Sequence, residues 1–235
     1  MTTRKRISVI ALLMTLAAGT LSPAAEAAAS RYITISAQGS VKVVPDAVRI
    51  NATATSVAAS SKEASAATAK TSAAVRAALK IAKIDSKDIA TQSVTVYPEY
   101  KYNTDGSSTL IGYRGSQSFT IIVRAADTAG SVVDALVAAG GDNLQINGAT
   151  PFILDSTQSL EAARAAAVKS AKAKAASYAK LMGVKLGKIN YLVENSAPTN
   201  YTPVMATAKA ESDATVIDLG QQDVTISVTV QWSLL

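Results

Sequence analysis

Two long segments of this chain place alanine along one helical stripe, and this feature limits the fold more than any other. The first spans residues 60–83 and the second spans residues 157–182. Alanine recurs there at the three- and four-residue spacing of one helix face, and the lysines lie off that face. Because alanine buries little apolar surface, such a helix must lie close on its partner layer. The pattern therefore predicts two helices that pack closely on β-sheet.

Local signals mark where the helices begin. Ser60 and Glu63 have the spacing of a capping box at the start of the first long helix, and Asp155 with Gln158 has the same spacing before the second. A third, shorter helix is predicted for residues 127–139 because a pair of glycines follows it and can supply a left-handed C-cap.

Alternating polar and apolar residues predict the strands, since side chains on a strand repeat with a period of two. A short opening strand is expected to turn at Gly39, and the Asp105-Gly106 pair indicates a hairpin turn between two long strands. The predicted strands span residues 32–36, 41–44, 47–57, 93–102, 110–124, 143–154, 188–194 and 214–234.

The order of these elements repeats along the chain. The order strand, helix, strand, strand occurs in each of two halves, at about residues 32–125 and 143–235, which a helix at about 127–140 joins. The sequence therefore predicts an α+β fold in which two related β-α-β-β halves form mixed or antiparallel sheet covered by alanine-rich helices.

The N-terminal segment is typical of a cleaved secretory signal. Three basic residues at positions 4–6 precede an apolar run, and small residues with A-x-A spacing end it near Ala27. We expect residues 1–27 to be a signal peptide and residues 28–235 to be the mature, secreted or periplasmic domain, with no membrane span. A retained N-terminal anchor is the alternative, but the apolar run is short for a bilayer crossing.

The composition excludes several kinds of site. The chain contains neither cysteine nor histidine, so disulfides, lipid-modified cysteine and the usual histidine or thiol chemistry do not apply. The net charge of +6 falls to +4 without the signal peptide, and the basic residues are dispersed, which argues against nucleic acid as a partner. We expect no enzymatic activity, no cofactor and no metal site, although a hydrolase that uses serine or carboxylate groups stays formally open.

Tyrosines gather near the predicted hairpin. Tyr97, Tyr100, Tyr102 and Tyr113 lie there, although the chain has only 8 tyrosines, 2 phenylalanines and 1 tryptophan. They can cover their neighbours across the ribbon, or they can form a subunit contact, where tyrosine is enriched. The long connection at residues 195–213 is a second candidate contact element. The candidate oligomer or ligand contacts are Tyr97, Tyr100, Tyr102, Tyr113, Tyr201 and Met205.

Short stretches spread over nearly the whole mature chain have the order and spacing of a known family. They are Ile35, Gly39 and Val43 before residues 45–47; residues 88–91 and 96–100; Tyr113 before 119–123; Gly130 with 133–134; 140–143; 162–164 with Ala167; and 186–188 before Glu194. These residues resemble the SIMPL-domain family, which includes periplasmic immunogenic and oxidative-stress-defence proteins of bacteria. Residues 37–38 and 220–221 depart modestly from the family pattern.

The resemblance implies an α/β fold of two related halves and, in some members, a ring or barrel-like homo-oligomer that encloses a channel. It implies no catalytic residues, because the family has none established. The resulting hypothesis is an exported, self-assembling structural or binding module of the cell envelope, protective under stress, whose partner is a second copy of itself. The alternative is a monomeric carrier that binds an envelope ligand beside residues 195–213, and a histidine-independent hydrolase is less favoured.

Overall fold

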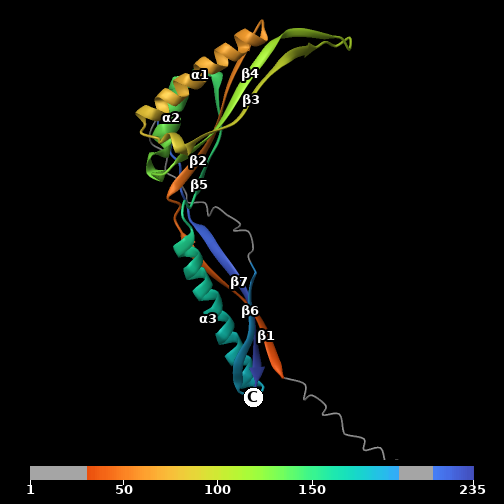
Figure 1. Cartoon of the computed structure of the whole chain (residues 1–235), viewed down its shortest axis with the longest axis vertical. Helices are drawn as coiled ribbons and strands as arrows, with labels where there is room; N and C mark the ends of the chain where they lie inside the picture. The colour runs from red at the N-terminus through yellow and green to blue at the C-terminus, as the bar shows by residue number, and fades with distance from the viewer. Residues whose placement is uncertain (1–30, 196–213) are drawn as a thin grey trace, which may run out of the picture.

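A computed structural model of the protein describes residues 31–195 and 214–235. The chain is elongated, with a larger sheet and two helices at one end and a smaller sheet and one helix at the other (Figure 1). The elements are β1 (Tyr32–Val43), β2 (Ala47–Ala58), α1 (Ser61–Ile81), η1 (Ser86–Asp88), β3 (Ile89–Tyr102), β4 (Ser108–Val123), η2 (Ala126–Thr128), α2 (Ala129–Gly140), η3 (Gly141–Asn143), β5 (Leu144–Phe152), α3 (Thr157–Leu181), β6 (Leu186–Asn195) and β7 (Gln222–Leu234).

The strands form two antiparallel sheets, which together with the helices confirm the α+β class. One sheet has the order β3-β4-β2-β5 and the other has the order β1-β7-β6. Every strand pairing in the described part of the chain is antiparallel, so the antiparallel form of the predicted sheet is the one adopted.

Consecutive described strands change from one sheet to the other after β1 and again after β5. β1 leads directly into β2, yet β1 pairs with β7 in the small sheet while β2 pairs with β4 and β5 in the large one. β5, the first strand of the second strand-helix-strand-strand unit, pairs with β2, and the chain then returns to the small sheet through α3. The two halves therefore exchange strands: β1 of the first half lies in the small sheet, and β5 of the second half lies in the large sheet.

The large sheet has its core under α1 and α2. The predicted capping box starts α1: the Ser60 hydroxyl accepts a bond from the backbone N–H of Glu63, and the Glu63 carboxylate accepts one from the backbone N–H of Ser60. Val75 and Leu79 of α1 are fully buried against Phe119 of β4 and the apolar residues of α2. Three-residue and four-residue spacing on α1 therefore produces the buried face that the sequence predicts.

α3 covers the small sheet through alanines spaced four residues apart, and the sheet contributes the larger side chains. The buried alanines are Ala163, Ala167, Ala171, Ala175 and Ala179. A Cβ atom on Gly39 of β1 would lie 2.1 Å from the backbone N of Ala167 and 2.3 Å from the backbone O of Ala163. The turn predicted at Gly39 is therefore wrong: the glycine lies within β1 because the α3 backbone comes too close for any side chain.

Two predicted boundaries also change. Ser156, rather than Asp155, is the N-cap of α3, and the Asp155 carboxylate accepts a bond from the backbone N–H of Thr157 at 2.9 Å. The final strand begins at Gln222 instead of residue 214. Residues 214–221 instead run beside α2, where both the backbone N–H and the hydroxyl of Thr215 donate to the Asp134 carboxylate.

An ion pair links the connection between α1 and β3 to the end of β4. The Arg124 guanidinium donates two bonds of 2.7 Å to the Asp88 carboxylate, which is almost fully buried. These bonds hold the pKa of Asp88 below its ordinary value of 3.8. The resulting stabilisation is present above that ordinary pKa and is lost as the pH falls through the lower folded-state value.

We expect Asp88→Asn to lower the stability at pH 7 and to weaken its decline below about pH 4, because the variant lacks the depressed carboxyl group. Urea unfolding at pH 7 and at pH 3 measures both effects. Asp218→Asn is the matched control, since Asp218 is exposed on the 214–221 segment. An equal pH dependence in Asp88→Asn and in the unsubstituted protein would contradict this role for the ion pair.

Candidate functional site

The β3–β4 hairpin projects from the large sheet beyond α1 (Figure 1). The turn is short: the Asn103 backbone N–H donates to the Ser107 carbonyl, and Gly106 takes a positive φ of 85°. β3 is an edge strand, so one side of its backbone is free of neighbouring strands among the described residues. The hairpin therefore offers both apolar side chains and an unpaired strand edge.

Three of the predicted contact tyrosines are exposed on this hairpin. Tyr97 and Tyr100 are nearly half exposed, and Tyr102 near the turn is 81% exposed, whereas Tyr113 is only partly exposed. Tyr100 lies opposite Leu110 in the ribbon, and Leu110 is also exposed. The structure thus brings the four tyrosines onto one hairpin without covering its outer end. Tyr201 and Met205, the other two candidates, lie outside the described residues.

An ion pair holds the base of the hairpin. The Arg114 guanidinium donates to the Glu99 carboxylate across the ribbon, and both side chains are partly buried. The bond raises the pKa of Arg114 above its ordinary value. Because Tyr97 lies directly opposite Arg114, this pair orients the strand from which the tyrosines project.

The strand β6 is also apolar and exposed, and its exposure was not predicted from the sequence. α3 packs on β1 and β7 and leaves most of β6 uncovered among the described elements. Between two-fifths and three-fifths of each large apolar side chain is exposed there, at Ile189, Tyr191, Leu192 and Val193. β6 is also an edge strand. The sequence does indicate this exposure, because the apolar residues of β6 are adjacent instead of alternating with polar ones. A strand with that pattern is apolar on both faces.

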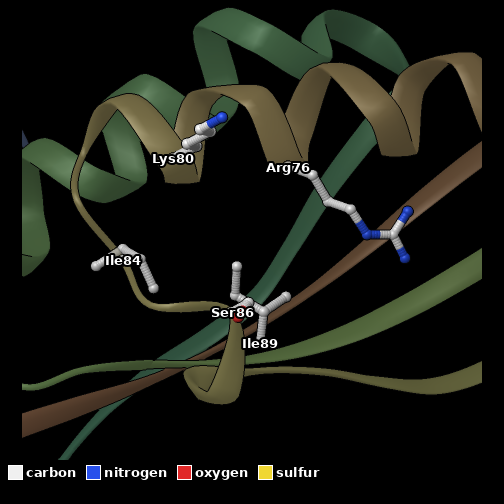
Figure 2. A pocket seen from close by; sticks show the side chains of 5 residues that line it. All are labelled: Arg76, Lys80, Ile84, Ser86 and Ile89. Atoms are coloured by element: carbon white, nitrogen blue, oxygen red, sulfur yellow. The ribbon is translucent and has the colours of Figure 1, made fainter.

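A cleft of about 430 Å³ lies between the C-terminal part of α1 and the chain that enters β3. Figure 2 shows Arg76 and Lys80 on α1, with Ile84, Ser86 and Ile89 on the opposite side. No motif in the sequence indicates this cleft, because its two sides come from different elements.

Within residues 31–195 and 214–235, no group of three or more aspartates and glutamates is placed to hold a metal ion. None of the helices in the same ranges combines the length and the apolar character needed to cross a bilayer.

Comparison with known proteins places the chain in a family. The 26 kDa periplasmic immunogenic protein of Brucella melitensis biotype 1 is 27% identical, over 86% of this chain and 84% of the relative. The uncharacterized protein YggE of Edwardsiella ictaluri is 29% identical over 92% of both chains, and that of Escherichia coli K12 is 30% identical over 77% of this chain and 72% of the relative. The family model described as SIMPL, protein of unknown function (DUF541), matches residues 33–232. The chain therefore belongs to the SIMPL family.

Proposed function

We propose that this protein is an exported module of the bacterial cell envelope that assembles from copies of itself through the β3–β4 hairpin. The observation that carries the proposal is the uncovered end of that hairpin, where Tyr97, Tyr100, Tyr102 and Leu110 are exposed together. A two-stranded ribbon is marginally stable in water unless something packs on it. A covering partner would bury these side chains and stabilise the ribbon.

A second copy suits this surface for a geometric reason. The edge of β3 can pair antiparallel with the same edge of another molecule, because a two-fold axis brings identical strands together in opposite directions. Backbone hydrogen bonds would then add to the burial of tyrosine, a residue enriched at interface cores. β6 supplies another exposed apolar edge, so the described part of each chain offers a second such surface. Assemblies larger than a dimer would form if both surfaces were used.

The envelope location rests on two further observations. The first is the basic and apolar segment at residues 1–27, which has the pattern of an export signal. The second is the name of the Brucella relatives, which describes them as periplasmic. In this proposal the protein acts by assembly and binding rather than by catalysis, and protection of the envelope under stress is its physiological role.

The test is light scattering coupled to size exclusion on the mature protein at micromolar concentration. We expect a molar mass of at least twice that of the chain, falling on dilution. A single monomeric species at every concentration would remove self-assembly from the account.

A further inference from the structure

The cleft at the end of α1 joins two unlike walls. Arg76 and Lys80 are one helical turn apart on α1, where their charged ends point in different directions, and Ile84, Ser86 and Ile89 lie on the chain that follows the helix (Figure 2). The volume of about 430 Å³ is within the range of small-molecule sites. Such sites usually combine apolar walls with a few polar groups that fix the orientation of the ligand.

The two cations of this cleft lack an acidic partner among the described residues. The nearby acids are already engaged, because Asp85 pairs with Lys87 and Asp88 pairs with Arg124. An anion placed in the cleft could therefore approach either cation without breaking an existing ion pair.

The Arg76 side chain is also held in place before any ligand arrives. Its Nη2 donates to the Thr91 hydroxyl at 3.3 Å, and its guanidinium carbon lies 5.2 Å from the centre of the Phe119 ring. An arginine that is already ordered loses less entropy when it binds a ligand. The guanidinium keeps N–H groups beyond the one that bonds to Thr91, so it can donate to an anion as well.

We propose that this cleft binds a small organic carboxylate, with the carboxylate at Arg76 and Lys80 and an apolar tail against Ile84 and Ile89. A monoanion fits better than a dianion such as phosphate, because the C-terminal end of α1 carries a partial negative charge. The cleft volume limits the tail to a short chain or a single ring. This site is independent of the hairpin surface, since the two lie on different parts of β3.

Four probes separate the parts of this proposal in calorimetric titrations of the mature protein. Hexanoate carries both the charge and the tail, acetate carries only the charge, hexanol carries only the tail, and inorganic phosphate carries a different charge. We expect hexanoate to bind saturably and at least about tenfold more tightly than each of the other three. Backbone amide signals of Ser86 and Ile89 should shift on binding. No saturable binding of hexanoate, or equal binding of acetate, would overturn the proposal.

Charge variants locate the site. Lys80→Gln and Arg76→Gln should each weaken hexanoate binding by about tenfold or more, because each removes a charge-assisted hydrogen bond. Lys70→Gln is the matched control: it removes the same charge from an exposed position of α1 outside the cleft. Lys80 is exposed, so Lys80→Gln keeps the test valid even if Arg76→Gln disturbs packing on Phe119. Equal weakening by Lys70→Gln would show general attraction to a cationic surface and would overturn the site.

Discussion

Gly39→Val is expected to lower the free energy of unfolding by about 3 kcal/mol or more. The valine Cβ would lie 2.1 Å from the Ala167 backbone N and 2.7 Å from the Ala166 carbonyl carbon. These are main-chain atoms of α3, so no side-chain rotation can relieve the overlap, and the helix must move away from β1. That movement would open the contact between the alanine stripe and the small sheet.

Urea unfolding followed by tryptophan fluorescence measures this effect directly. Trp232 is the only tryptophan and is buried in the small sheet under α3. The urea midpoint should fall by roughly 1 M or more. Gln38→Val is the matched control, because Gln38 is the exposed neighbour on β1, and its midpoint should change little. Equal midpoints for Gly39→Val and Gln38→Val would refute the close approach of α3.

The paired substitution Tyr100→Ser with Tyr102→Ser is expected to weaken self-association by about a hundredfold or more. Exposed tyrosines that become buried at the centre of an interface contribute about 2 kcal/mol each when they are energetically dominant. The free monomer should lose little stability, because both side chains face solvent in the single chain. Sedimentation velocity over a range of concentrations measures the dissociation constant.

Tyr178→Ser provides the matched control for that experiment. Tyr178 is 52% exposed, close to the 45% of Tyr100. It lies on α3, which covers the small sheet, and is therefore not part of the hairpin. The control should associate as the unsubstituted protein does. If the double hairpin variant associates as tightly as the Tyr178→Ser control, another surface, such as β6, forms the contact.

Local chemistry made much of the fold predictable from the sequence. The Ser60 and Glu63 capping box starts α1 as expected, because both of its hydrogen bonds form within one turn. The alternation through Val224, Ile226 and Val228 gives a strand with one buried face, as a period of two requires. These signals involve residues close together in the chain, so they need no knowledge of the partner elements.

The partners of the strands could not be predicted in the same way. Nothing in the pattern of β1 distinguishes β7 from another antiparallel neighbour, because several strands share the same alternation. The Gly39 position shows the limit clearly: a glycine in a strand can mark a turn or a close approach of another backbone. Only the position of α3 over β1 decides between them.

The same distinction between local and distant residues applies to the candidate surfaces. The tyrosine cluster could be predicted, because Tyr97, Tyr100 and Tyr102 share one strand of an evident hairpin. The cleft could not, since Arg76 and Ile89 come together only after α1 folds back over the start of β3. The exposure of β6 likewise depends on the position of α3, which covers β1 and β7 and leaves β6 mostly uncovered. The sequence of β6 itself does not encode that position.

The pairing of β1 with β7 places the beginning and the end of the described chain side by side, with Tyr32 opposite Ser233. The ribosome makes β1 long before β7, so the small sheet cannot close until β7 has been synthesised. Contacts this distant in sequence slow folding. Because β7 is also the middle strand of its sheet, a chain that stops short of residue 222 would leave both β1 and β6 without a neighbour in that sheet.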